Sequence, residues 1–139
     1  MFDFFRAWLM VVGFGMAVGG VAMALLAGTR VFDVIDRLID PAFWKAPPDA
    51  ATRQFQAWSY AVTGAVMAGW GLTVAILAWQ AFPSRQAWAW WAVAAGAGLW
   101  FVLDTGQSLR HRVFANAAIN VAVLVAVAVP LIAIFGEFH

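Results

Sequence analysis

Four long apolar runs dominate the pattern of hydrophobic and polar positions along the chain, and short polar stretches separate them. The runs cover about residues 4–27, 55–82, 86–103 and 113–135. Each reaches the length of about 17–25 residues that a helix needs to cross a bilayer. Alternating ten-residue patterns, which mark membrane barrels, are absent from the sequence. We therefore predict an all-α integral membrane four-helix bundle, with residues 1–139 forming one transmembrane domain.

The only sizeable polar segment lies between the first two runs. Its first half carries Val31, Ile35, Leu38 and Ile39 among charged residues, which is helical periodicity. We expect a short amphipathic helix over about residues 30–44, lying in the membrane interface. The helix should end at Pro41, because a proline disfavours a helical residue before it.

Three aspartates share one face of that predicted helix. Asp33, Asp36 and Asp40 are spaced by three and four residues, and carboxylates of this kind can bind a divalent cation. Arg37 lies four residues from Asp33, which instead favours an internally paired, solvated face. The sequence therefore predicts no metal site here.

Composition supports a membrane protein and excludes several function classes. The chain is 65% hydrophobic and 11% charged, far from the average of soluble domains. It has no cysteine, which excludes disulfides, thiolate metal sites and cysteine catalysis. The formal net charge of +1 provides no basic field for nucleic acid. The expected surroundings are a lipid bilayer, and no nucleic-acid partner is expected.

The distribution of basic residues predicts an orientation. With four spans, Arg6 and Arg85 lie on the side of the termini, and the other six basic residues lie on the opposite side. By the positive-inside rule, segments 28–54 and 104–112 face the cytoplasm and both termini lie outside. We place the protein in a prokaryotic inner membrane.

Polar residues gather at the predicted cytoplasmic ends of the last three spans. Asn116 and Asn120 are four residues apart and share a helix face, and an amide without partners in hydrocarbon costs several kcal/mol. Asp104 follows a run with no charge since Arg85, and an ionisable group at such a position suggests a function. The candidate polar pocket comprises Tyr60, Thr63, Asp104, Gln107, Asn116 and Asn120.

A purely structural interpretation of these residues stays open. Asp104 can lie outside the hydrocarbon and pair with Arg110 or Arg112, while the asparagines only hold helices together. Arg110 and Arg112 most simply contact anionic lipid headgroups.

Small residues in the first run predict a helix-packing face. Gly15 and Gly19 form a GxxxG motif, with Gly13 and Gly20 nearby. Such residues let a second helix backbone approach closely. The partner helix can belong to the same bundle or to another chain.

No motif in the sequence indicates catalysis or a cofactor. The metalloprotease, nucleophile-elbow and phosphate-loop signatures are absent. His111 and His139 are expected on opposite sides of the membrane, which argues against a bis-histidine haem. Ser108, His111 and Asp104 crowd one predicted turn and do not suggest a catalytic triad. We expect no cofactor, and nothing favours an enzyme.

Two functions remain. In the first, the protein is a non-catalytic accessory or structural subunit that packs against a membrane-protein partner or a second copy of itself. In the second, the polar pocket binds or transports a small solute, an ion or a lipid. Transporters usually carry polar groups at mid-bilayer. The mid-depth of these runs is almost wholly apolar, which favours the first function.

Overall fold

Four long helices and one short helix make up the protein. The computed structural model describes residues 1–138. Its long helices are α1 (Phe2–Leu26), α3 (Ala50–Ile76), α4 (Ala87–Arg110) and α5 (Phe114–Ala133). Each belongs to a helical segment that is long and apolar enough to cross a membrane. The predicted all-α four-helix membrane bundle is confirmed.

Short helical segments join the long helices. α2 (Asp33–Ile39) lies between the first two spans, as predicted, with the 3-10 turns η1 (Arg30–Phe32) and η2 (Asp40–Ala42) on either side. A π-helical turn, η3 (Leu77–Ala81), and a 3-10 turn, η4 (Phe82–Ser84), lead from α3 to α4. The turn η5 (Phe135–Glu137) follows α5.

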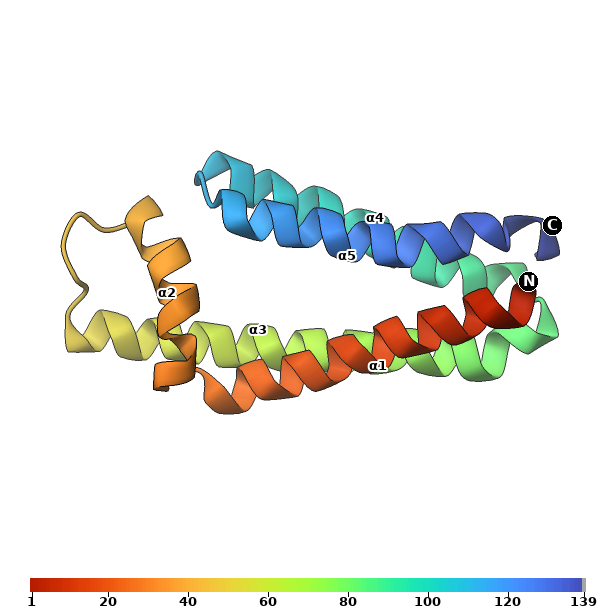
Figure 1. Cartoon of the computed structure of the whole chain (residues 1–139), viewed down its shortest axis with the longest axis horizontal. Helices are drawn as coiled ribbons and strands as arrows, with labels where there is room; N and C mark the ends of the chain where they lie inside the picture. The colour runs from red at the N-terminus through yellow and green to blue at the C-terminus, as the bar shows by residue number, and fades with distance from the viewer. Residues whose placement is uncertain (139) are drawn as a thin grey trace.

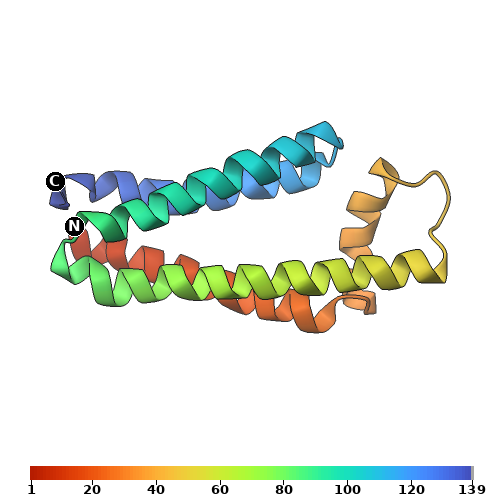
Figure 2. The same ribbon diagram turned by 180° about the vertical axis from the view of Figure 1, so that it is seen from behind.

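The long helices form two antiparallel pairs. α1 packs along α3, and α4 packs along α5 (Figure 1). The pairs meet at the end that holds both termini and diverge toward α2, as the view from behind also shows (Figure 2). Although only short turns separate α3 from α4, α4 leaves α3 and packs mainly on α5.

Glycines bring the backbones of α1 and α3 into contact. A Cβ atom built on Gly13 would lie 2.7 Å from the carbonyl oxygen of Gly71, and one on Gly20 would lie 2.5 Å from that of Gly64. Both distances are far below van der Waals contact, so only glycine fits. Gly13 and Gly20 are seven residues apart, as are Gly64 and Gly71, so the two pairs repeat along the antiparallel interface.

The apolar core that joins the two helix pairs occupies only the half of the bundle nearest the termini. In the described part of the chain it does not extend past Ala97 on α4 or Val127 on α5. The Trp90 indole N–H donates to the carbonyl of Leu131 at 2.9 Å, which ties α4 to α5 inside this core. The buried members are Leu9, Val74, Ala78, Phe82, Ala89, Trp90, Val93, Ala97, Val127, Leu131, Ile134 and Phe138.

Two helix boundaries differ from the prediction. α3 begins at Ala50 because the Asp49 carboxylate caps it, accepting from the backbone N–H of Thr52 at 2.8 Å. α4 continues to Arg110, so Asp104 lies within the helix and not at its end. The chain then reverses in a short turn in which Arg112 adopts a φ of 61°.

The glycine contact generates a stability prediction. Gly20→Ala should destabilise the protein by about 1–3 kcal/mol, because the added methyl overlaps the α3 backbone and forces the helices apart. Gly15→Ala is the matched control, since a Cβ there has no neighbour within 4 Å. Thermal unfolding in detergent measures both variants. Equal melting temperatures for the two would contradict the close-packed interface.

Candidate functional site

Asp104 lies at the centre of a hydrogen-bonded cluster between α4 and α5. Its Oδ1 accepts from the side-chain amides of Asn116 at 2.7 Å and Asn120 at 2.8 Å, and from the hydroxyl of Ser108 at 3.2 Å. The amide of Asn116 also donates to Ser108 Oγ, and that of Asn120 to Thr105 Oγ1. We call these five residues the Asp104 cluster.

Hydrogen-bond donors surround the carboxylate of Asp104 in place of a cation. No ion pair of Asp104 occurs among the described residues, and both Arg110 and Arg112 are exposed. Asn120 is only 3% exposed, so its amide depends on partners within the protein. Amide and hydroxyl donors stabilise a carboxylate that is withdrawn from water. The cluster therefore holds α4 and α5 together beyond the apolar core.

A second polar cluster docks α2 on the beginning of α3. The guanidinium of Arg53 pairs with Asp40 at 2.8 Å and Asp36 at 3.2 Å, and it donates to Gln56 Oε1. The amide of Gln56, a residue only 7% exposed, donates to Asp40 at 2.8 Å and to the hydroxyl of Tyr60 at 2.9 Å. Two of the three aspartates on the predicted acidic face, Asp36 and Asp40, are thus paired internally, with Arg53 in place of Arg37. The expected pair of Asp33 with Arg37 does not form among the described residues.

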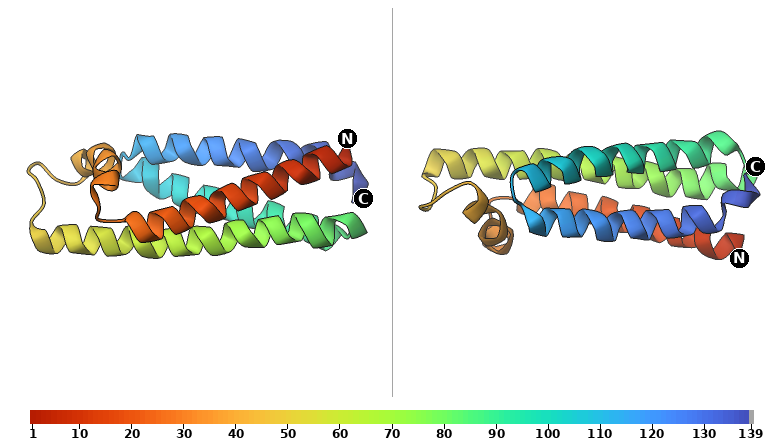
Figure 3. Two further views of the ribbon diagram at one scale, coloured as in Figure 1. Left: turned by 60° about the horizontal axis from the view of Figure 1, so that its bottom comes forward. Right: turned by 90° about the horizontal axis from the view of Figure 1, so that it is seen from above.

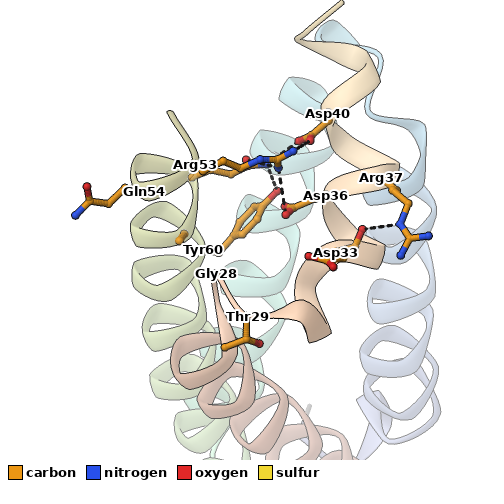
Figure 4. Close-up of a pocket in the computed structure, with 11 residues that line it drawn as sticks. Gly28, Thr29, Asp33, Asp36, Arg37, Asp40, Arg53, Gln54 and Tyr60 are labelled. Carbon is orange, nitrogen blue, oxygen red and sulfur yellow. Dashed lines mark hydrogen bonds and ion pairs between the residues drawn. The ribbon is translucent and has the colours of Figure 1, made fainter. Parts of the chain in front are cut away.

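A cleft of about 620 Å³ opens beside this second cluster. Residues of α2 and η2, the first three turns of α3 and the segment after α1 line it, as the close-up shows (Figure 4). We call this feature the α2 cleft. Its charged lining residues are Asp33, Asp36, Arg37, Asp40 and Arg53.

The charge of Asp36 is only partly compensated. Burial, the largest cause, raises the pKa of Asp36, and the nearby Asp40 carboxylate adds to this effect. The guanidinium of Arg53 acts in the opposite direction without cancelling it. Asp36 Oδ1 is buried, and the described residues provide it with no hydrogen-bond partner. Burial thus outweighs a guanidinium that Asp36 shares with Asp40.

The residues of the predicted polar pocket fall into separate places. Asp104, Asn116 and Asn120 come together in the Asp104 cluster, whereas Tyr60 belongs to the second polar cluster, between α2 and α3. Thr63 is exposed, and its hydroxyl donates to the Ser59 carbonyl of its own helix. Gln107 is exposed on α4.

The predicted glycine face is only partly used within the chain. Gly19 faces the side chain of Met67 on α3, whereas Gly15 is exposed with open space around it. The closest approach of α1 and α3 is made by Gly13 and Gly20, which the sequence analysis placed only near the motif. Within this bundle, Gly15 therefore packs against nothing.

Sequence reasoning missed Arg53 and Ser108 as members of the two clusters. Arg53, Gln56 and Tyr60 are spaced by three and four residues, so they share one helix face, which was an available signal. Ser108 fell in a segment predicted as a turn, so its helical register with Asp104 was not visible.

Metal-ligating side chains do not gather in the described part of the chain, where no group of three or more His, Cys, Asp or Glu residues could hold a metal ion. The ring of His111 contacts that of Phe43 with centroids 5.7 Å apart, which joins the segment after α2 to the turn between α4 and α5. His139 lies outside the described residues.

Comparison with protein-family models, with curated proteins and with solved structures finds no match to this chain.

The Asp104 cluster predicts a measurable coupling between α4 and α5. In a double-mutant cycle, Asp104→Ala and Asn120→Ala should couple by about 0.6–1.7 kcal/mol, the range found for hydrogen bonds in membrane bundles. Thermal or denaturant unfolding in detergent gives the four stabilities. The control pair, Asp104→Ala with Thr63→Ala, should be additive because Thr63 bonds only to its own helix. Additivity in both cycles would rule out the cluster.

The raised pKa of Asp36 predicts a pH effect with a definite sign. The folded state holds this proton more tightly than the unfolded state, whose pKa is near 3.8, the ordinary value for aspartate. The contribution of Asp36 to stability is thus complete below that pH and is lost as pH rises through the folded-state pKa. Relative to Asp36→Asn, the wild-type protein should lose detergent thermostability as pH rises above about 4, the ordinary pKa of aspartate.

Asp49→Asn provides a control of opposite sign for the same measurement. The hydrogen bond from the backbone N–H of Thr52 lowers the pKa of Asp49, so its stabilisation is lost as pH falls. Identical slopes for the two variants would contradict the assignment.

Proposed function

We propose that the protein is a small non-catalytic membrane protein that acts by helix packing, as an accessory or structural subunit that meets a partner protein or a second copy of itself. The four apolar helices make it a membrane protein. The observation that supports helix packing as its role is the one-sided core, which joins the two helix pairs only in the half nearest the termini.

A one-sided core leaves helix faces available in the other half. A bundle that works alone gains packing contacts wherever its helices meet, and these contacts drive helix association in lipid. Here the pairs diverge toward α2, which the left view of Figure 3 also shows. Helices of another chain are suitable occupants for such faces.

Gly15 marks the face on α1 that we assign to association. It lies between Val11 and Val18 on the exposed side of the helix, and these two valines are 71% and 69% exposed. A glycine between larger residues forms a notch into which a partner helix can pack. Within residues 1–138, no group fills this notch.

A second candidate function is ligand binding, and the α2 cleft is the observation that favours it. Its volume of about 620 Å³ lies within the usual range of about 300–1,000 Å³ for ligand sites. Its polar and charged lining suits a small solute, an ion or a lipid headgroup.

Native mass spectrometry after gentle extraction tests the packing function. A homo-oligomer, or a complex with a second polypeptide at fixed ratio, is the expected result. Gly15→Leu should weaken that association roughly tenfold or more, because an overpacked contact costs about 1–3 kcal/mol. Gly69→Leu is the matched control, since Gly69 is also exposed with open space but lies on α3.

A wild-type protein that is monomeric under these conditions would overturn the packing function. An association that survives Gly15→Leu unchanged would overturn the assignment of the α1 face.

A further inference from the structure

The α2 cleft has more acid than base in its lining. Three aspartates and two arginines line it, which leaves one uncompensated negative charge. Arg53 is fully engaged by Asp36, Asp40 and Gln56. Asp33 lies outside this pairing, since it is exposed and makes no ion pair among the described residues.

Arg37 remains available beside Asp33. Its Nε donates to the backbone carbonyl of Asp33 at 3.1 Å, and it forms no ion pair within residues 1–138. The two terminal nitrogens of an arginine held this way are free to bind an anionic oxygen, since guanidinium groups bind phosphate in a bidentate manner. In Figure 4 the Arg37 side chain lies on the side of α2 away from Arg53 and Tyr60. The rim of the cleft thus offers an unpaired carboxylate and an unpaired guanidinium four residues apart on α2.

The interfacial position expected for α2 from its sequence would place these groups at the depth of lipid headgroups. α2 crosses the ends of the spanning helices at a steep angle to α3 (Figure 1). The other face of η1 and α2 carries Val31, Val34 and Leu38, whose side chains are 63%, 60% and 56% exposed. Charged residues on one side and apolar residues on the other are typical of a helix that lies in the membrane interface.

A headgroup with a primary ammonium and a phosphate matches this pair of charges. The ammonium carries three N–H donors that a carboxylate accepts, whereas a trimethylated ammonium has none. An anionic headgroup without an amine would satisfy Arg37 but would add negative charge beside Asp33. Discrimination among headgroups therefore depends on the carboxylate.

We propose that the α2 cleft binds a phosphoethanolamine group, with its ammonium at Asp33 and its phosphate at Arg37. This inference rests on the second candidate function, ligand binding in the cleft, and names its ligand class. A phosphatidylethanolamine headgroup and free phosphoethanolamine share this chemistry, and the interfacial position of α2 favours the lipid.

Native mass spectrometry of the full chain with added lipids tests the proposal. The probes are phosphatidylethanolamine, phosphatidylcholine and phosphatidylglycerol with identical acyl chains. Phosphatidylethanolamine should be retained roughly tenfold more than phosphatidylcholine, as expected when a charge-assisted hydrogen bond is gained. Asp33→Asn should remove this preference. Asp3→Asn is the control and should keep the preference. It removes the same charge from the first turn of α1, where Asp3 pairs with Arg6.

A second variant separates the ligand class from the function of the cleft. Arg37→Gln should reduce retention of phosphatidylethanolamine and phosphatidylglycerol alike. Equal retention of the three lipids in the wild type, or a preference for phosphatidylglycerol, overturns the phosphoethanolamine proposal. In that case a loss of retention in Arg37→Gln still supports ligand binding in the cleft. If neither variant changes the retention of any lipid, ligand binding at the cleft is overturned as well.

Free phosphoethanolamine distinguishes the two sources of the ligand. Binding of the free compound without lipid, with the same dependence on Asp33, supports the proposed chemistry and identifies a soluble ligand. Binding of the lipid alone supports the headgroup as the natural ligand.

Discussion

The contact between the backbones of α1 and α3 is the constraint on which the rest of the structure depends. Gly13 faces Gly71 and Gly20 faces Gly64, so no side chain separates the helices at these levels. Small residues permit dispersion contacts over a long interface, which is the main attraction available between helices in lipid. Because α2 follows α1 directly and docks on α3, this contact also fixes where the α2 cleft lies.

Polar interactions take over where the apolar core ends. In the half of the bundle near α2, the Asp104 cluster joins α4 to α5, and the pairing of Arg53 with Asp36 and Asp40 joins α2 to α3. The first set acts within the α4–α5 pair, and the second joins α2 to α3 of the other pair. Neither set joins the two helix pairs to each other. The two pairs keep their own geometry in this half, while the shared core near the termini sets how they meet.

Hydropathy and helical spacing predicted the spans, the short helix between the first two and the closeness of Asn116 to Asn120, because each depends on local periodicity. The sequence could not show which pairs of helices pack closely. Gly13 and Gly20 look no different from Gly15 until the partner helix is known. The extent of α4 was equally hidden, since Asp104 to Arg110 is polar enough to form a turn in water. The separation of Tyr60 from Asp104 follows from the divergence of the pairs, which no local pattern encodes.

Because the shared core lies at one end, each helix pair forms a lever arm that is attached to the other pair at its terminal end. With 24 residues, α4 is about 36 Å long at ~1.5 Å per residue. A rotation of about 5° at the terminal end would move the far end of such an arm by about 3 Å, by simple geometry. The rings of Phe43 and His111 meet at that far end. Any such rotation would therefore be felt most where Phe43, after η2, contacts the turn between α4 and α5.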